Sequence, residues 1–258
     1  MNAFKVTMLA SGSKGNSALI STGKQNFLVD MGISCRMLTS RLKEIGFNVE
    51  DLDGVLITHE HTDHVNGLGT FTKKYSVPIY SSELTWRAIL SKQPNILRHN
   101  CRIIGGVLRC GEVEINSFEI PHDAVDPHGY VFKCNGSKCA YITDTGFVTP
   151  AVRQAAEDAD TIILEANHDV EMLKKGIYPP HLKQRILSTR GHLSNESAGW
   201  LLANLPRLPE NIILAHLSQE NNLPHLALDT VRNILDGASL FNEARIIVAA
   251  QDRIVKDY

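Results

Sequence analysis

The stretch Thr58-His59-Glu60-His61-Thr62-Asp63-His64 decides how this chain is interpreted. It follows the apolar run Gly54-Val55-Leu56-Ile57, which predicts a buried strand. Three imidazoles and a carboxylate therefore lie close together where a strand gives way to a loop. Histidine and aspartate bind borderline divalent metals, and ligands this dense reach one ion or two neighbouring ions. A polar loop with merely solvated histidines explains this density poorly, so we interpret the stretch as a metal site.

The composition is that of an ordinary globular protein. The 258 residues include 43% hydrophobic and 21% charged residues, enough for a substantial core. The formal net charge of −2 gives no overall basic signature, so contact with a polyanion needs a local patch. Five cysteines without a CxxC pair fit reduced thiols, and neither a signal peptide nor a membrane-spanning apolar run is visible. We expect a cytoplasmic protein that does not contact membranes.

Hydrophobic periodicity predicts two strand-rich blocks with helices between and around them. Strands are expected at 4–10, 17–22, 26–30, 54–57, 77–81, 103–109, 112–120, 129–134, 138–143, 161–166, 211–215 and 245–250. Helices are expected at 35–45, shortly after the histidine cluster, and at 83–91, 150–158, 169–175, 180–188, 196–204 and 224–236. This order predicts two packed sheets flanked by helices, in a single domain over 1–258.

Further polar candidates stand at the ends of other predicted strands. Strand ends are rigid and face a common rim, so ligands from distant segments can converge there. Taken singly, such a residue is more often structural, but jointly with the histidine cluster these residues complete two coordination shells. The candidates are Asp30, His122, Asp144 and His216.

The order His59-x-His61-x-Asp63-His64, then His122, Asp144 and His216, resembles the metallo-β-lactamase fold family over nearly the whole chain. The resemblance implies an α+β fold, a four-layer αβ/βα sandwich with two mixed β-sheets flanked by helices. Residues 10–17, 165–169 and 191–195 resemble more narrowly the YycJ/WalJ-like branch. The implied protein is a cytosolic dinuclear hydrolase akin to the family's nucleases and phosphodiesterases. Flavodiiron-type relatives are excluded, because they carry Glu where this chain has His61.

The resemblance also implies a role for each ligand. One ion is held by His59, His61 and His122, and a second by Asp63, His64 and His216. Asp144 bridges the two ions, which makes Asp63 and Asp144 candidates for catalysis, while Asp30 supports the histidine loop from behind. Two such ions activate a shared water and neutralise charge on the transition state. Zinc suits the histidine-rich set, and the carboxylates also accommodate manganese or iron.

His192 is the candidate proton donor to the leaving oxygen. It precedes a capped helix, and its segment resembles the Gly-His-Ser segment that serves this role in tRNase Z. A purely structural role as a capping residue remains an alternative. Glu165 and His168 end a predicted strand, and Glu165 either orients His192 or His168 or simply anchors the turn.

Candidate substrate contacts come from three segments. The glycine-rich loop 11–17 either cradles a phosphate or forms a plain tight turn. The run 174–190 is basic, contains no acidic residue and leads to His192, so it either contacts a phosphate backbone or is a solvated face. The helix start after His192 presents free N–H groups. The residues named are Ser13, Asn16, Lys183, Arg185, Ser194 and Asn195; His128, His181 and His225 are assigned to the surface or rim without a role.

These features favour a metal-dependent phosphodiesterase or nuclease, exonuclease-like, with DNA or RNA as its partner. A thioester or carboxylic-ester hydrolase of the glyoxalase II type is the first alternative, because the metal core alone does not choose phosphorus over carbon. A non-catalytic regulatory module is the second, and the intact ligand set argues against it. The sequence leaves open DNA versus RNA and the oligomeric state, a homodimer included.

Overall fold

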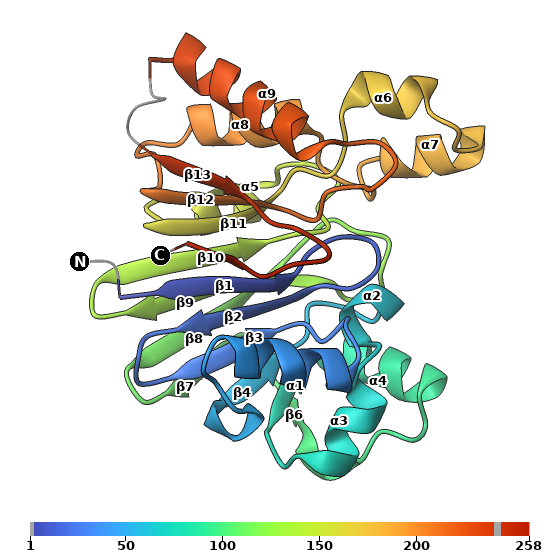
Figure 1. Cartoon of the computed structure of the whole chain (residues 1–258), viewed down its shortest axis with the longest axis vertical. Coiled ribbons are helices and arrows are strands. Elements are labelled where there is room, and N and C mark those ends of the chain that lie inside the picture. Colours follow the sequence, from blue (N-terminus) through green and yellow to red (C-terminus); the bar gives the residue numbers. More distant parts are fainter. Residues whose placement is uncertain (1–2, 240–243, 258) are drawn as a thin grey trace.

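The computed structural model describes residues 3–239 and 244–257. Two β-sheets pack face to face between outer helices (Figure 1). The first sheet has the order β14 (Val255–Lys256), β1 (Lys5–Ala10), β2 (Ser17–Ser21), β3 (Asn26–Val29), β4 (Gly54–Leu56), β5 (Ile79–Ser81), β6 (Cys101–Ile103). The second has the order β13 (Arg245–Val248), β12 (Asn211–Ala215), β11 (Thr161–Glu165), β10 (Ser137–Ile142), β9 (His128–Cys134), β8 (Val113–Glu119), β7 (Val107–Cys110).

Both sheets are mixed, which confirms the expected sandwich of two mixed β-sheets. In the first sheet β1, β2 and β3 are antiparallel neighbours, whereas β3 to β6 run parallel. In the second sheet β7 to β10 are antiparallel, whereas β10 to β13 run parallel. The parallel strand β11 is buried along its whole length and apolar in its middle, as expected of a strand covered on both faces.

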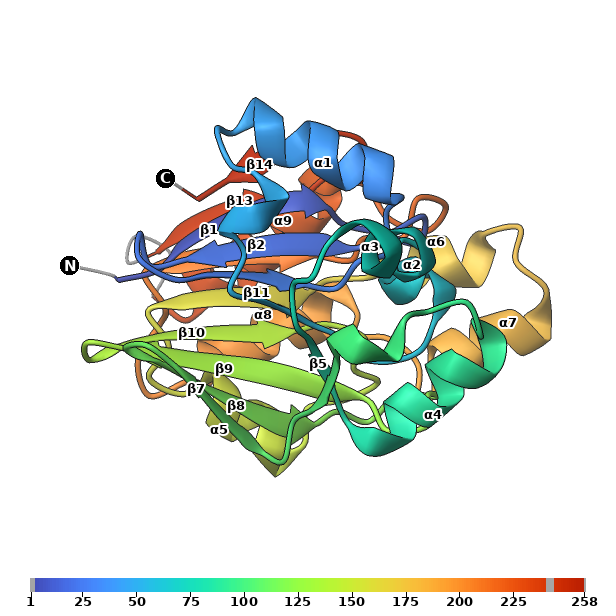
Figure 2. The same ribbon diagram turned by 90° about the horizontal axis from the view of Figure 1, so that it is seen from below.

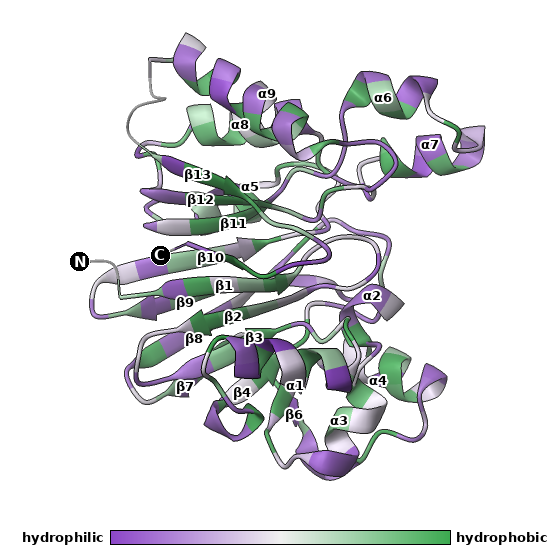
Figure 3. Ribbon diagram, viewed as in Figure 1, coloured by the Kyte–Doolittle hydropathy of each residue, from purple (hydrophilic) through white to green (hydrophobic). Residues whose placement is uncertain are grey.

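The helices cover the outer faces of the two sheets. Figure 1 shows α8 and α9 outside the second sheet and α1, α3 and α4 outside the first. Figure 3 shows mixed hydrophilic and hydrophobic residues on α1 and α9, typical of helices with one face on a core. The helices are α1 (Cys35–Glu44), α2 (Thr62–Val65), α3 (Leu68–Lys74), α4 (Glu83–Lys92), α5 (Pro150–Ala156), α6 (Val170–Lys175), α7 (Pro180–Ile186), α8 (Asn195–Ala203) and α9 (Pro224–Gly237). Short 3-10 turns lie at Val49–Asp51 and Arg98–Asn100.

Three hydrophobic clusters hold the layers together. Between the sheets, Phe27 packs in one cluster with Tyr130 and Phe132. Leu38 of α1 belongs to the cluster outside the first sheet, and Val231 of α9 to the cluster outside the second. These three cores separate four layers, helices, sheet, sheet and helices, which is the expected four-layer arrangement. In the described part of the chain, none of the helices has the length and apolarity that crossing a bilayer requires.

Two of the predicted elements differ from the structure. The strand predicted at 103–109 is two strands, β6 and β7, which belong to different sheets. Gly105 and Gly106 separate them, and Gly106 has a φ of 91°, a conformation that lets the chain cross from one sheet to the other. The short helix predicted after the histidine cluster is two helices, α2 and α3, and the C-terminal strand β14 was not predicted.

The topology gathers the polar strand ends at one edge. The strands β10, β11 and β12 run parallel, so the residues that follow them lie at the same end of the second sheet. The parallel pair β3 and β4 does the same in the first sheet. Figure 2 shows α2, α4, α6 and α7 clustered beyond this same end of the sandwich. The candidate residues therefore meet where the two sheets open towards these helices.

Candidate metal centre

Three of the residues at strand ends have a left-handed backbone. Asp30 after β3, Asp144 after β10 and His216 after β12 have φ values of 61°, 58° and 55°. Non-glycine residues rarely adopt this conformation, and such strain tends to cluster at functional sites. The three strands that carry these residues thus end in the same kind of sharp backbone turn.

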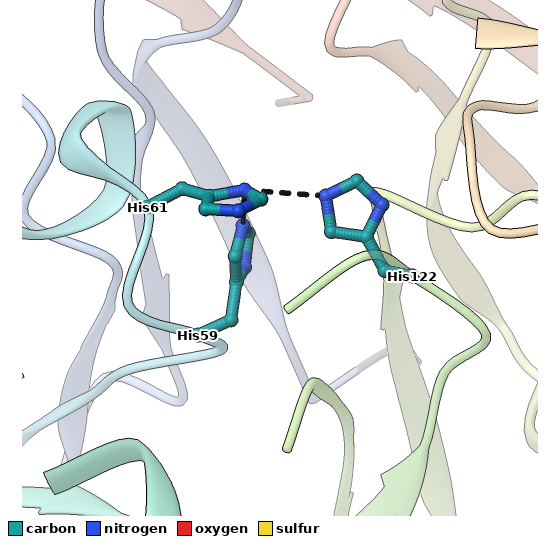
Figure 4. A group of neighbouring side chains, drawn as sticks. All are labelled: His59, His61 and His122. Carbon is teal, nitrogen blue, oxygen red and sulfur yellow. Dashed lines mark hydrogen bonds between the residues drawn. The ribbon is translucent and has the colours of Figure 1, made fainter. Parts of the chain in front are cut away.

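Three histidine nitrogens converge on the side of the first predicted ion (Figure 4). His61 Nδ1 lies 3.0 Å from His59 Nε2 and 3.3 Å from His122 Nε2. His122 donates from Nδ1 to the carbonyl of Gly191 at 3.1 Å, which leaves Nε2 for a ligand. Burial lowers the pKa of His59 well below its usual value and also lowers that of His122. Both rings are therefore neutral, as metal ligands must be.

A second group of atoms meets around Asp63. Its Oδ2 lies 3.4 Å from His64 Nε2 and 3.5 Å from His216 Nε2. His64 donates from Nδ1 to Asp30 Oδ2 at 2.8 Å, and His216 donates from Nδ1 to Glu165 Oε1 at 2.9 Å. Each carboxylate behind a ring fixes its tautomer and presents Nε2 to the same point.

Asp144 lies between the two groups. Its Oδ2 is 3.4 Å from His64 Nε2, and its Oδ1 is 3.3 Å from His216 Nδ1 and 3.9 Å from His122 Nε2. Asp144 Oδ2 and His216 Nε2 are buried and have no hydrogen-bond partner. Buried polar atoms are nearly always satisfied, so orphaned donor atoms of this kind point to a missing partner. The cluster is therefore compatible with divalent metal binding.

Opposite charges accumulate in this centre. Burial alone lowers the pKa of His216, but Asp144, Asp63 and Glu165 outweigh burial and raise it to about 10. Burial likewise raises the pKa of Asp63, yet His64 and His216 hold it well below its usual range. A cation bound at this centre would compete with protons for the histidine nitrogens, because metal ligation requires neutral imidazole.

Two residues fix the histidine loop from behind. Asp30 is fully buried and accepts from the Thr58 backbone N–H at 2.9 Å, as well as from His64. Asp30 thus contacts both the start of the histidine loop and His64 at its end. Gly32 packs directly on the Asp63 carbonyl, since a Cβ at Gly32 would lie 1.6 Å from that oxygen. Gly32 was not among the predicted residues, and its sequence signal is only a glycine two residues after a strand-end aspartate.

Glu165 links His192 to His216, one of the candidate metal ligands. Its Oε1 accepts from His192 Nδ1 at 2.8 Å and from His216, while Oε2 accepts from the backbone N–H groups of Thr145 and Leu193. Burial by itself raises the pKa of Glu165, but His192 and His216 hold it far below its usual range. Glu165 is therefore an ionised, fully buried acceptor that fixes two imidazoles at once.

Glu165→Gln is expected to lower kcat by roughly 10- to 100-fold, as is typical when a residue behind a ligand is lost. The amide nitrogen would face N–H groups, so His192 and His216 lose their shared anchor. Steady-state hydrolysis of a chromogenic phosphodiester together with the metal content of the purified protein checks this. Glu112→Gln, an exposed glutamate paired with Lys24, is the control that should change neither quantity. An unchanged rate in Glu165→Gln would mean that Glu165 only anchors the turn.

A cavity of about 260 Å³ lies over the two ligand groups. The rest of its wall comes from the 11–17 loop, from the segment that includes α7, and from the loops that carry Asn167 and Ser218. The side chain of His192 is 20% exposed and borders it. The lining includes His61, Asp63, His122, Asp144, His192, His216, Ser13, Asn167, Tyr178 and Arg185.

The two candidates in the 11–17 loop lie in different surroundings. Ser13 is exposed and lines the cavity. Asn16 is buried, with Nδ2 3.3 Å from Asp63 Oδ2 and 3.2 Å from His64 Nε2. Ser13 is therefore open to the cavity, whereas Asn16 contacts two of the candidate metal ligands.

The candidates beside His192 lie in the interior. Ser194 caps α8 by accepting from the Ser197 N–H, and Asn195 is fully buried and pairs with Asn222. His168 is buried, neither ring nitrogen has a hydrogen-bond partner, and burial lowers its pKa to about 4. None of these three lines the cavity over the ligands.

Of the two candidates in the basic run 174–190, Arg185 lines the cavity and Lys183 does not. Arg185 lines the cavity and forms an ion pair with Asp123, whose Oδ1 is 3.3 Å from His122 Nε2. Lys183 donates instead to the carbonyl of Lys174 at 2.7 Å. Asp123 was not predicted, although it directly follows a predicted ligand. His181 and His225 are exposed and His128 is partly buried, and all three lie outside the cavity.

Comparisons with known proteins place the chain in a family. Residues 25–217 match the model of the beta-lactamase superfamily domain. The chain is 44% identical over 243 residues to exodeoxyribonuclease WalJ of Streptococcus pneumoniae, covering 92% of this chain and 90% of that protein. It is 40% identical over 233 residues to exodeoxyribonuclease YycJ of Bacillus anthracis, covering 89% and 88%. Among solved structures, the metallo-beta-lactamase fold protein YhfI from Bacillus subtilis superposes with a TM-score of 0.72 at 19% identity, covering 99% and 100%. The chain belongs to the beta-lactamase superfamily, in the same branch as the WalJ and YycJ proteins.

Proposed function

We propose that this protein is an exodeoxyribonuclease that hydrolyses the phosphodiester bonds of DNA with two divalent metal ions. The carrying observation is the pair of ligand groups on either side of Asp144, beneath a cavity that His192 borders. Two relatives that match nearly the whole chain are named exodeoxyribonucleases, which favours DNA over RNA as the substrate.

The ligand groups suit two ions. His59, His61 and His122 would hold one, while Asp63, His64 and His216 would hold the other, with Asp144 between them. When bound, such a pair supplies Lewis-acid activation of water and of the phosphate. The nitrogen-rich set favours zinc, and the carboxylates also accommodate manganese or iron.

His192 would deliver the proton that the leaving oxygen needs. Its Nδ1 is committed to Glu165 at 2.8 Å, so the ring holds one orientation and leaves Nε2 for the substrate. A histidine fixed in this way is a suitable general acid. This arrangement favours an oxygen ester such as a phosphodiester over a thioester, because an alkoxide leaving group requires protonation more than a thiolate does.

One comparison tests the proposal. The metal-loaded protein is offered end-labelled duplex DNA, single-stranded DNA, RNA and a thioester in parallel. We expect stepwise shortening of DNA, with much slower turnover of RNA and of the thioester. Preferred hydrolysis of the thioester would instead establish the glyoxalase-type alternative, and no turnover of any substrate would leave the regulatory module.

Arg185→Ala is expected to weaken DNA binding and to flatten its salt dependence by about one unit of log–log slope. The reason is that Arg185 borders the cavity, where a phosphate can replace Asp123 as its partner. Binding titrations over a range of salt concentrations measure this slope. Lys175→Ala is the matched control, since Lys175 is paired with Glu171 and does not line the cavity. Equal effects of the two substitutions would contradict a specific contact at Arg185.

A further inference from the structure

A second cavity adjoins the metal centre and has no part in the mechanism above. Its volume is about 290 Å³, and it shares His122 with the first cavity. Its walls come mainly from the segment 119–127, together with Phe147, Thr189 and Arg190. We call it the Phe147 pocket. Its place directly beside a ligand of the first ion puts any occupant within reach of the reacting phosphate.

The chemistry of the Phe147 pocket combines an exposed aromatic ring with polar groups. Phe147 is 44% exposed and Val125 is 56% exposed, so two large apolar side chains face solvent beside the centre. Arg190 supplies donors, and Asp126 and Glu119 supply acceptors around them. An aromatic face with hydrogen-bonding groups at its rim suits a flat heterocycle such as a nucleobase.

Hydrogen bonds tie the walls of the Phe147 pocket to one another. Gly146 donates to the carbonyl of Pro121 at 2.9 Å, which joins the loop after β10 to the loop after β8. Arg190 Nε donates to the carbonyl of His122 at 3.2 Å. Thr145 Oγ1 donates to the carbonyl of Phe147 at 2.9 Å. The pocket is thus formed in advance of binding, which lowers the ordering cost for an occupant.

Glu60 fixes this pocket relative to the metal ligands. It lies between His59 and His61 in sequence, is buried, and was given no role by the sequence. Its carboxylate accepts from the Val125 N–H at 3.1 and 3.3 Å. The wall of the pocket is therefore held by the loop that also carries the ligands.

We propose that the Phe147 pocket binds the base of the terminal nucleotide of a DNA strand, stacked on Phe147. This inference rests on the proposed exodeoxyribonuclease function. The terminal base is the occupant because the first cavity borders the basic side of α7, where Arg185 and Tyr178 can contact the continuing strand. The Phe147 pocket lies against His122 and takes the one base beyond the scissile phosphate.

The test compares two DNA strands that differ only in their terminal nucleotide, which is intact in one and abasic in the other. The metal-loaded wild-type protein should remove the intact nucleotide with a kcat/KM at least about fivefold higher, given usual base–aromatic stacking. An abasic site placed internally instead should have no such effect. Sensitivity only to the internal abasic site would overturn the assignment of the terminal base.

Variants separate stacking from misfolding. Phe147→Ala should reduce the preference for the intact end to about twofold or less, whereas Phe147→Trp should retain it. Trp200→Ala is the control, because Trp200 is an aromatic residue that is 58% exposed on α8 and lines neither cavity. A misfolded variant would lose activity on both strands equally and keep the ratio.

Binding is followed separately with 2-aminopurine at the strand end, joined by a linkage that resists hydrolysis. Wild type and Trp200→Ala should quench its fluorescence on binding, and Phe147→Ala should not. Cleavage of DNA without a preference for the intact end would overturn the base pocket and leave the proposed function standing. Failure of the wild type to bind or cleave any DNA would overturn both.

Discussion

Asp144→Ala is expected to abolish DNA hydrolysis, with a fall in kcat on the order of a thousandfold or more, since bound metals supply several kcal/mol of transition-state stabilisation. Asp144 is the carboxylate between the two ligand groups, with one oxygen 3.4 Å from His64 and the other 3.3 Å from His216. Without the Asp144 carboxylate, no negative charge would lie between the two histidine groups to offset the charge of a bound cation. Metal content per chain, measured by atomic emission alongside kcat, should fall together with the rate.

The control for this substitution is Asp158→Ala. Asp158 has the same left-handed backbone, with a φ of 57° against 58° at Asp144, but it lies in the turn after α5 and lines no part of the metal cavity. Asp158→Ala therefore shows how far replacing an aspartate that has a left-handed backbone changes metal content and kcat when the residue lies outside the centre. Full metal occupancy and normal turnover in Asp144→Ala would contradict the bridging position.

His192→Ala should lower kcat on DNA by roughly 10²- to 10⁴-fold while both metals are retained, the usual range for loss of a general acid. His192 contacts Glu165 and borders the cavity. Its ring belongs neither to the histidine group around His61 nor to the group around Asp63. Removing its ring therefore removes a proton source and leaves the ligand groups intact. Single-turnover rates and metal analysis of the same preparation measure the two effects.

The leaving group distinguishes proton donation from a structural role. A diester that releases 4-nitrophenolate needs little protonation, so His192→Ala should slow it by no more than about tenfold. His181→Ala, at an exposed histidine on α7 outside the cavity, should slow neither substrate. Equal losses on DNA and on the nitrophenyl diester would remove His192 as the general acid.

The sequence was most informative where chemistry is local. His59, His61, Asp63 and His64 lie within one short stretch of chain after a strand, so covalent spacing alone places them together. The fold family was also accessible, because the sequence motif extends to later strand ends at Asp144 and His216, and the family comparison confirms it.

The sequence was least informative about contacts between distant segments. Arg185 and Asp123 form an ion pair although they are 62 residues apart in the sequence, and the sequence around neither residue predicts this contact. The predicted strand at 103–109 is divided between two sheets, because local propensity does not record which sheet a strand joins. Asn16 was predicted to contact a substrate, and no local pattern indicated that its amide packs against Asp63 and His64.

The sequence by itself determined the types and order of the candidate ligands and, through its resemblance to a known family, the fold, because a motif is written in the covalent chain. Only the tertiary structure decided that Glu165 anchors two histidines at once and that Glu60 holds the wall of the Phe147 pocket. Such contacts arise where loops from different strands pack together. Their partners are therefore set by the burial of the whole sandwich and not by any local pattern.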